Sequence, residues 1–278
     1  FKSLIEKLWP NNYNDPYFNE KIFAPKEFKE KISNLNPLFE GIAANDAKDL
    51  VNFIIMTLHI ELNNNPNPNN SNNNNHINLD QRNQMVMFQN FMEEFNSSNR
   101  SIISELFYAI NCNITKCSNC TTQIYNYQTY FFLVFPLEEV RKFKYNNSQY
   151  NFNNNFNSNE VNINDCFEYD RKINLMFGEN SMYCNYCKLN TNCKMYTCLT
   201  TGPTILILLL NRGHGIEFNV KIIFMEDLDL SNYIEYKNFV CKYKLIGVIT
   251  HIGESGMGGH FIAYCKDPIS QSWNKYNG

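Results

Sequence analysis

The sequence predicts an α+β protein in which helices come first along the chain and a mostly antiparallel sheet follows. Two patterns predict this order. Up to about residue 110, apolar residues recur every three or four positions, which is typical of amphipathic helices. From Cys112 onward, segments rich in Tyr, Phe, Thr and Val are separated by turn residues, which is typical of strands.

Length and composition indicate a globular protein with a substantial core. The chain has 278 residues, of which 44% are hydrophobic and 15% aromatic, enough for one large or two modest domains. Its net charge of −3 gives no excess of basic residues that would attract nucleic acid or an anionic membrane. The longest aliphatic run, residues 205–210, is far shorter than the roughly 20 residues that span a bilayer. We therefore expect no nucleic-acid partner, no membrane association and a monomer.

The helical part contains one clear helix. Residues 1–40 are punctuated by four prolines and predict short helical or irregular segments. From Ala47 to about Glu61 the apolar spacing predicts an amphipathic helix, for which Asn45 or Asp46 is a suitable N-cap. One or two further helices are predicted between residues 85 and 108 by the same spacing.

Two asparagine-rich tracts interrupt the chain. Residues 63–75 read NNNPNPNNSNNNN, and residues 146–159 are similar in composition. Such segments bury too little apolar surface to offset the entropy of ordering them. We expect both to be disordered insertions in surface loops.

The remaining apolar segments predict strands. Each is rich in β-branched and aromatic residues and is bounded by turn residues. The segments are residues 123–135, 194–200, 204–210, 218–224 and 243–251.

Four of the ten cysteines form two Cys-x-x-Cys pairs, Cys117 with Cys120 and Cys184 with Cys187. Each pair lets two thiolates approach one ion from a tight turn, and four thiolates complete a closed, structural Zn²⁺ site. Two other interpretations stay open: four unliganded cysteines in turns, and a redox pair, although no βαβ pattern surrounds either pair. Zinc would pin two hairpin tips together. Because metal-binding thiols are typical of a reducing compartment, we expect a cytoplasmic and/or nuclear protein.

The other six cysteines lie in or beside apolar sequence, and we interpret them as small core residues. None has the setting of a reactive thiolate at a helix N-terminus. They are Cys112, Cys166, Cys193, Cys198, Cys241 and Cys265.

The last twenty-one residues, GGHFIAYCKDPISQSWNKYNG, predict a β-hairpin. A turn centred between Pro268 and Ile269 places His260 directly opposite Asn277, with Cβ atoms roughly 5 Å apart on one face. A histidine held by a carboxamide is the base and orienting group of a Cys-His-Asn system. The alternative is that the two residues are neighbours by accident. Cys265 points to the opposite face and cannot be the nucleophile for this histidine.

Together these features resemble the catalytic domain of the ubiquitin-specific proteases, papain-like cysteine peptidases that cleave after the C-terminal glycine of ubiquitin. FEGIAANDAKDLVNFIIMTLHIELN resembles the family's QQDAxEFL segment, and the two Cys-x-x-Cys pairs resemble its zinc-bearing fingers. TGPTILILLLNR resembles the strand written LPxxLxxxLxRF, and YKLIGVITHIGESGMGGHFIAYCKD with WNKYNG resembles the His box. The resemblance covers almost the whole chain. It implies one catalytic domain: a helical thumb at 1–110, fingers at 111–200 that bind zinc, and a palm at 201–278.

The resemblance also implies roles for individual residues. His260 would be the general base that deprotonates the attacking thiol, and Asn277 would orient its imidazole. Asp46 matches the acidic residue implied to hold the arginine-bearing tail of ubiquitin, although a helix N-cap is an equally plain role. Gly258 and Gly259 would let a tail of two glycines pass close to the backbone.

One element of the family is missing from the sequence. Members begin with a Cys box, roughly GLxNxGNTCYMNxxLQ, and the first cysteine here is Cys112. The chain also has Asn45 where the family has Gln, Asp49 where it usually has Glu, and Gly278 where a second acidic residue is common. We therefore expect these 278 residues to be inactive by themselves, since loss of the nucleophile costs orders of magnitude in rate.

Three hypotheses follow for the function. The first is a deubiquitinase whose Cys box lies outside this sequence, which begins with FKSLIEKLWP and has neither an initiator Met nor a signal peptide. The second is a catalytically inactive scaffold that binds ubiquitin. The third is a zinc-binding interaction protein unrelated to ubiquitin.

Overall fold

The chain divides into two units, Phe1–Ile54 and Ile55–Gly278, in a computed structural model that describes residues 2–8, 24–41, 45–64, 83–148, 159–213, 219–253 and 259–277. The boundary falls inside helix α3, Ala47–Glu61, whose bounds agree with the predicted helix. The division of the chain into thumb, fingers and palm stays a prediction.

The first unit is helical. It contains α1 (Lys2–Leu8), α2 (Lys26–Leu35), the short 3₁₀ helix η2 (Pro37–Phe39) and the first half of α3. The Ser33 hydroxyl donates to the carbonyl of Phe39 at 2.8 Å, and the Phe39 ring packs on Phe53 with centroids 5.5 Å apart. Pro25 directly precedes α2 and Pro37 begins η2, so these two prolines delimit short helices, as expected.

Two more helices follow in the second unit, α4 (Gln84–Ser98) and α5 (Ile102–Phe107). The α4 side chains Phe88 and Phe91 pack on the ring of Tyr127 in the sheet, with centroids 5.5 and 6.0 Å apart. A reciprocal capping box between Ser101 and Ser104 begins α5. These helices confirm the prediction of one or two helices between residues 85 and 108.

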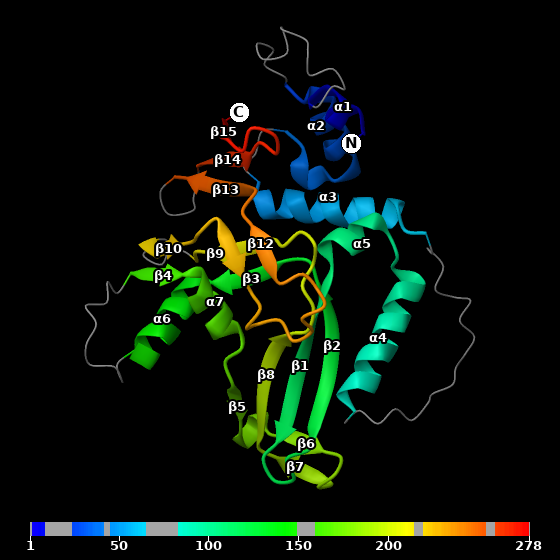
Figure 1. Cartoon of the computed structure of the whole chain (residues 1–278), viewed down its shortest axis with the longest axis vertical. Coiled ribbons are helices and arrows are strands. Elements are labelled where there is room, and N and C mark those ends of the chain that lie inside the picture. The colour runs from blue at the N-terminus through cyan, green and yellow to red at the C-terminus, as the bar shows by residue number, and fades with distance from the viewer. Residues whose placement is uncertain are drawn as a thin grey trace. The chain divides into compact units, whose positions relative to one another are not determined.

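A four-stranded sheet in the order β2-β1-β8-β5 contains the two longest of the described strands, β1 and β2. Strands β1 and β2 form a hairpin, and β8 pairs with the other edge of β1. Figure 1 shows these strands running together toward the small hairpin of β6 and β7. The strands are β1 (Ala109–Cys117), β2 (Gln123–Tyr130), β5 (Asn174–Met176), β6 (Met182–Cys184), β7 (Leu189–Thr191) and β8 (Cys193–Leu199).

The main core contains two helices that the sequence analysis missed. Helices α6 (Leu137–Ser148) and α7 (Ile163–Asp170) follow β3 (Leu133–Pro136) and β4 (Glu160–Asn162). Apolar side chains of both helices, of β3 and of β4 form this core, and those that are fully buried include Phe135, Leu137, Val140, Val161 and Phe167.

Two strand pairs of the second unit are parallel. The other seven pairs of named strands in the described residues are antiparallel, so the predicted mostly antiparallel arrangement holds. Strand β3 pairs with β9 (Leu208–Asn211), and β4 pairs with β10 (Lys221–Ile223). Parallel pairing requires long crossover connections, and α6 and α7 lie within them.

The C-terminal part is antiparallel, as predicted. Strand β11 (Asp227–Asp229) pairs with β12 (Lys242–Lys244), and β13 (Gly247–Ile252), β14 (His260–Lys266) and β15 (Trp273–Tyr276) form a three-stranded sheet in that order. The segment 243–251, predicted as one strand, is interrupted before Gly247 and contributes to both sheets.

The asparagine-rich tracts fall largely outside the described residues. Of the tract 63–75, only Asn63 and Asn64 are described, and the side-chain amide of Asn63 donates to the carbonyl of Ser98 at 2.8 Å. The tract 146–159 begins inside α6, which continues to Ser148. Helix α6 therefore extends further into this tract than expected.

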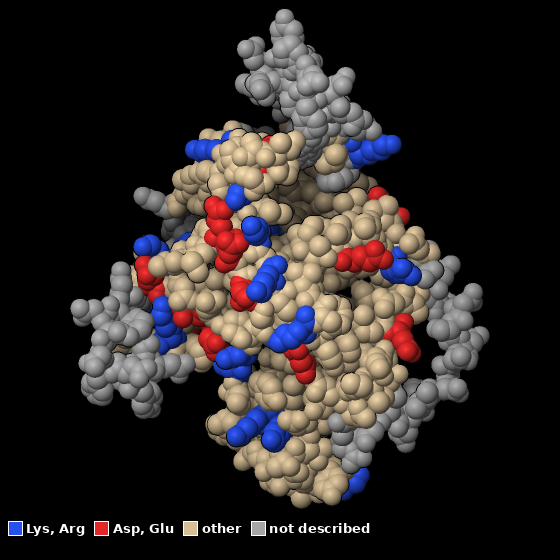
Figure 2. Space-filling model, viewed as in Figure 1, with Lys and Arg blue, Asp and Glu red and all other residues tan. Residues whose placement is uncertain are grey.

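Charged side chains of both signs lie among one another over much of the face shown in Figure 2. Ion pairs in the described residues include that of Lys144 with Asp165, at 2.8 Å. Within the described parts of the chain, no helix is both long and apolar enough to cross a membrane.

Candidate functional site

A histidine and an asparagine side chain meet at the end of the β13–β14–β15 sheet. His260 is the first residue of β14, and Asn277 directly follows β15. The Nε2 atom of His260 lies 2.5 Å from Oδ1 of Asn277, and both residues are exposed. Because an amide oxygen only accepts hydrogen bonds, Nε2 is the donor and Nδ1 carries the basic lone pair. The pair therefore has the arrangement of a base and its orienting group.

The register of this hairpin differs from the predicted one. Ala263 faces Tyr276, so the continuing register places Asn277 opposite Ile262 and diagonally across from His260. A shift of two residues keeps each side chain on its original face. The predicted contact is therefore present, although the predicted direct opposition is wrong.

The turn explains the shifted register. Asp267 Oδ1 accepts hydrogen bonds from the backbone N–H groups of Ile269 and Ser270, at 2.9 and 2.7 Å. The hydrogen bonds from Ser270, and then that from Ile269, lower the pKa of the Asp267 carboxyl and keep it ionised. The turn is thus centred between Ile269 and Ser270. The prediction had placed its centre one residue earlier, between Pro268 and Ile269.

Gly259 is required by its neighbour in the sheet. Its φ is +153°, and a Cβ atom there would lie 2.3 Å from Nε2 of His251. The half-buried His251 ring packs edge-on against Phe261, with centroids 4.9 Å apart, in agreement with a structural role. Gly258 lies outside the described residues. The role of both glycines toward a substrate stays a prediction.

Asp46 lies in the first unit, where it caps α3. Its Oδ1 accepts a hydrogen bond from the backbone N–H of Lys48 at 2.8 Å, and Lys48 Nζ lies 3.7 Å from Oδ2. An acceptor at this position satisfies an orphan N–H group of the first helical turn. The capping role is therefore confirmed, and the role in holding ubiquitin stays a prediction.

The four Cys-x-x-Cys thiols converge. Cys117 and Cys120 flank the β1–β2 turn, and Cys184 and Cys187 flank the β6–β7 turn. Their Sγ atoms all lie within 4.8 Å of one another, with Cys117 to Cys187 at 3.9 Å and Cys120 to Cys184 at 3.6 Å. Tetrahedral zinc with Zn–S bonds of about 2.3 Å has sulfur atoms about 3.8 Å apart. The cluster can hold a metal ion, and its spacing fits zinc.

The surroundings of the cluster favour thiolates at some positions. Burial raises the pKa of the Cys117 thiol, but hydrogen bonds from the backbone of Cys120 and from the Thr191 hydroxyl outweigh it and lower that pKa to about 6. The Thr191 hydroxyl lies 3.2 Å from Cys117 Sγ. By contrast, the hydrogen bond with Cys120 raises the pKa of Cys187 to about 12. Four simultaneous thiolates therefore require a cation among them.

Each Cys-x-x-Cys pair is followed by a residue in the left-handed region, Thr121 with φ +61° and Lys188 with φ +58°. Non-glycine residues adopt this conformation at a cost of roughly 1 kcal/mol. Each follows the second cysteine of its pair directly, so the strain lies in the turns that bring the thiols together.

Comparison with protein families shows which family the chain belongs to. All 278 residues, 1–278, match the family described as ubiquitin carboxyl-terminal hydrolase. The chain belongs to this family. The resemblance to ubiquitin-specific proteases inferred from the His box and the Cys-x-x-Cys pairs is thereby confirmed.

Several curated members of this family are similar to the chain. Ubiquitin carboxyl-terminal hydrolase 2 of Gallus gallus is 27% identical over 285 residues, covering 100% of the chain and 72% of that protein. The Bos taurus protein of the same name is 25% identical over 286 residues, and the chain spans 42% of its length. Ubiquitin carboxyl-terminal hydrolase 48 of Rattus norvegicus is 34% identical over 122 residues, covering 41% of the chain and 12% of that protein.

A solved structure shares the fold. It is described as "Structure of the SAGA Ubp8/Sgf11/Sus1/Sgf73 DUB module bound to ubiquitin aldehyde", and it matches with a TM-score of 0.59 and 17% identity. The match covers 90% of this chain and 47% of the other. The predicted α+β class with a papain-like cysteine peptidase fold is confirmed by this likeness.

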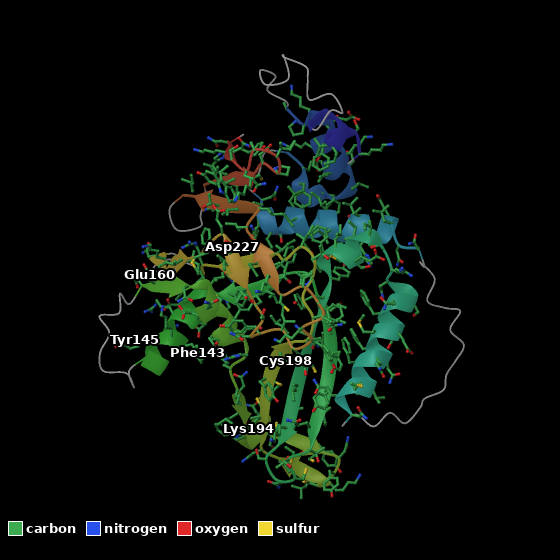
Figure 3. All side chains as sticks on the ribbon, viewed as in Figure 1. Phe143, Tyr145, Glu160, Lys194, Cys198 and Asp227 are labelled. Carbon is green, nitrogen blue, oxygen red and sulfur yellow. The ribbon has the colours of Figure 1, made fainter. Side chains whose placement is uncertain are left out.

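The other six cysteines of this family member stand outside the metal cluster. Cys112, Cys166 and Cys193 are buried, and burial raises the pKa of Cys166 to about 12. Cys198 lies on β8, where Figure 3 labels it, and Cys265 is exposed on β14 with its side chain on the face opposite that of His260. In the part of the chain that the structure describes, no hydrogen bond joins a cysteine to His260. The predicted core role therefore holds for the buried three and is wrong for Cys265, which is exposed.

The structure adds two residues that the sequence analysis did not single out. Thr191 touches the metal cluster, and Glu226 binds two side chains of the β14–β15 hairpin. Neither stands in a recognisable motif, since each acts through a partner that is remote in sequence.

Proposed function

We propose that this chain carries the general base and the ubiquitin-binding surface of a deubiquitinase, a cysteine-type ubiquitin thioesterase and isopeptidase. The reaction is hydrolysis of the bond after the C-terminal glycine of ubiquitin. The observation that carries the proposal is the 2.5 Å contact between His260 Nε2 and Asn277 Oδ1, in a chain that matches the ubiquitin carboxyl-terminal hydrolase family over its whole length.

In the proposed reaction, His260 carries the proton transfers. Nδ1 of His260 takes the proton of an attacking thiol, and the thiolate bonds to the carbonyl carbon of the terminal glycine. The C–N bond breaks as the imidazolium protonates the leaving amine, which gives a thioester. Nδ1 then takes a proton from water, whose oxygen attacks the thioester and releases the carboxylate and the thiol. Asn277 holds the ring in the Nε2–H tautomer that both steps need.

The thiol in this scheme is not one of the cysteines placed above. Four of them form the metal cluster, and three others are buried. Cys198 donates to Glu235, Cys241 donates to the carbonyl of Phe239, and Cys265 lies on the other face of β14. We therefore propose that the 278 residues alone do not turn over substrate, and that the nucleophile comes from polypeptide outside this sequence.

Ubiquitin is the proposed partner. Asp46 keeps an exposed carboxylate while it caps α3, so it can also accept the arginine-bearing tail of ubiquitin. Gly259 and Gly258 are the proposed passage for the two terminal glycines of that tail.

The proposed cofactor is one structural Zn²⁺ ion held by the two Cys-x-x-Cys pairs. When bound, it supplies a closed four-coordinate crosslink and no catalytic chemistry, since the four thiolates leave no open position. Its binding would fix the turn after β1 against the turn after β6. Chelation should loosen this end of the sheet and weaken ubiquitin binding while leaving His260 and Asn277 in place.

A fusion experiment tests the proposal. A Cys-box segment of the family, joined upstream of the chain, should confer hydrolysis of ubiquitin–aminomethylcoumarin, and the chain alone should show none. In the fusion, His260→Ala should lower kcat by at least about 100-fold, the usual contribution of a general base. Asn277→Ala should lower it less, and Asn274→Ala, exposed on the opposite face of β15, should leave it unchanged. An inactive fusion that is folded would end the proposal.

One observation favours a second candidate function. Because no described cysteine bonds to His260, the chain could serve as a ubiquitin-binding scaffold without catalysis. A fusion that binds ubiquitin but does not hydrolyse the coumarin conjugate would select this function. A fusion that binds neither ubiquitin nor its coumarin conjugate would point instead to a zinc-binding interaction protein unrelated to ubiquitin.

A further inference from the structure

Strand β15 leads directly into Asn277, but no residue of this strand is buried. All four of its residues, Trp273 to Tyr276, are exposed. The pairing register of a strand is weakly specified when neither face is buried. A slip of one residue would turn Asn277 to the other face, and a slip of two would move it about 6.8 Å along β14. The contact with His260 therefore depends on whatever fixes this register.

One carboxylate binds both members of a single register pair. Lys266, the last residue of β14, faces Trp273, the first residue of β15. Lys266 Nζ lies 2.6 Å from Oε2 of Glu226, and Trp273 Nε1 donates to Oε1 of the same residue at 3.2 Å. The ammonium of Lys266 also lies over the Trp273 ring, 5.9 Å from its centroid.

Glu226 itself is attached to the neighbouring strands. It directly precedes β11, whose first residue, Asp227, is labelled in Figure 3. Its carbonyl accepts a hydrogen bond from the backbone N–H of Leu245 at 2.7 Å, and the N–H of Lys266 donates to the carbonyl of Ile246 at 2.9 Å. The carboxylate thus projects from backbone that is bonded to the β12–β13 connection, and not from a loose loop.

The charge of Glu226 suits this role. Hydrogen bonds from Lys266 and Trp273 lower the pKa of its carboxyl, and Lys244 adds to the effect. The side chain is therefore ionised at neutral pH and accepts from both donors at once. A different register would remove one donor from its reach, because the two donors face each other only in the observed pairing.

The Asp267 turn cannot replace this contact. Its hydrogen bonds lie within residues 267–272, at the closed end of the hairpin. They persist if β15 separates from β14 beyond the turn. Glu226 instead holds Trp273, the residue from which β15 continues toward Asn277.

We propose that Glu226 is a positioning residue that fixes the register of the β14–β15 hairpin through Lys266 and Trp273, and so holds Asn277 against His260. The proposal rests on the proposed function for its catalytic meaning. Its structural content concerns the chain alone and is tested without substrate.

Nuclear magnetic resonance of the chain supplies the test. In the unaltered protein, the ring ¹⁵N shifts of His260 should show the Nε2–H tautomer, because Asn277 Oδ1 accepts from Nε2. In Glu226→Ala the population should move toward the Nδ1–H form, and hydrogen exchange of the β15 amides should rise about tenfold, the effect of losing a hydrogen bond to a charged acceptor. Trp273→Phe, which keeps the ring and removes the N–H donor, should change both signals in the same direction.

Asp229→Asn is the matched control. Asp229 lies in β11 and pairs with Lys242 at 3.3 Å, so this variant also removes an exposed ion pair without touching the hairpin. It should leave the His260 shifts and the β15 exchange rates unchanged.

An unchanged His260 tautomer in both folded Glu226→Ala and Trp273→Phe would overturn the proposal. So would equal effects in Asp229→Asn, since these would indicate general destabilisation. Failure of the fusion enzyme to hydrolyse its substrate, with these signals as expected, would instead count against the proposed function alone.

Discussion

Removal of the metal cluster has an effect that can be worked out from chain lengths. Cys120 and Cys184 are 64 positions apart in sequence, and their Sγ atoms are 3.6 Å apart. A crosslink that closes a loop of this length lowers the entropy of the unfolded chain by an amount worth roughly 4 kcal/mol at 25 °C. For a unit of about 200 residues, this corresponds to a fall in Tm of roughly 10 °C. We predict that Cys184→Ser abolishes zinc binding and lowers Tm by about this amount.

The assay combines metal content with thermal unfolding of reduced protein. The unaltered chain should bind one zinc ion, and a chelator should lower its Tm to that of Cys184→Ser. The variant itself should not respond to the chelator. Zinc affinity should also rise with pH, because binding releases protons from the thiols.

Cys193→Ser is the control. Cys193 faces Cys117 in the β1–β8 pairing and is equally buried, at 3% exposed, but it is not part of the cluster. It should keep full zinc binding and lose only about 1–3 kcal/mol, the cost of burying a hydroxyl. Reduced protein that takes up no zinc, or whose Tm does not respond to chelation, would refute the reasoning.

Three further predictions follow from single residues. Gly259→Ala should destabilise the protein by more than about 2 kcal/mol in urea unfolding, because its Cβ would meet the His251 ring at 2.3 Å; an unchanged midpoint would contradict the close approach. Lys188→Gly and Thr121→Gly should each stabilise the zinc-loaded protein by about 0.5–1 kcal/mol, because glycine tolerates a positive φ; a loss of stability in the same titration would show that the side chains matter more than the strain. Burial lowers the pKa of His59 in the folded state, despite a hydrogen bond to the Asn99 side chain that raises it. The unfolded chain then binds the proton more readily, so stability should fall as pH drops below about 6.5, and a His59→Gln variant should show a smaller fall between pH 7.5 and 5.

The candidate site could be predicted from sequence because its determinants are local. The contact between His260 and Asn277 needs only the alternation of a hairpin, and it survives a register error of two residues. The two Cys-x-x-Cys pairs likewise carry their own geometry in a three-residue spacing, so their convergence was predictable.

The missed features depend on remote partners. Helix α6 begins directly after Pro136 and continues into an asparagine-rich tract, two signals that favour a break. What stabilises it is the complete burial of Leu137 and Val140 in a core shared with α7. The parallel pairing of β3 with β9 and the contact of Glu226 with Trp273 also join segments far apart in sequence. No local pattern encodes these contacts.

We propose that the C-terminal tail of ubiquitin lies beside the His260–Asn277 pair. Titration of the ¹⁵N-labelled chain with ubiquitin tests it most directly, with the ring signals of His260 as the readout. The account predicts saturable shifts of these signals with intact ubiquitin and none with ubiquitin that lacks its two terminal glycines. Binding of intact ubiquitin that leaves the His260 signals unmoved would contradict it.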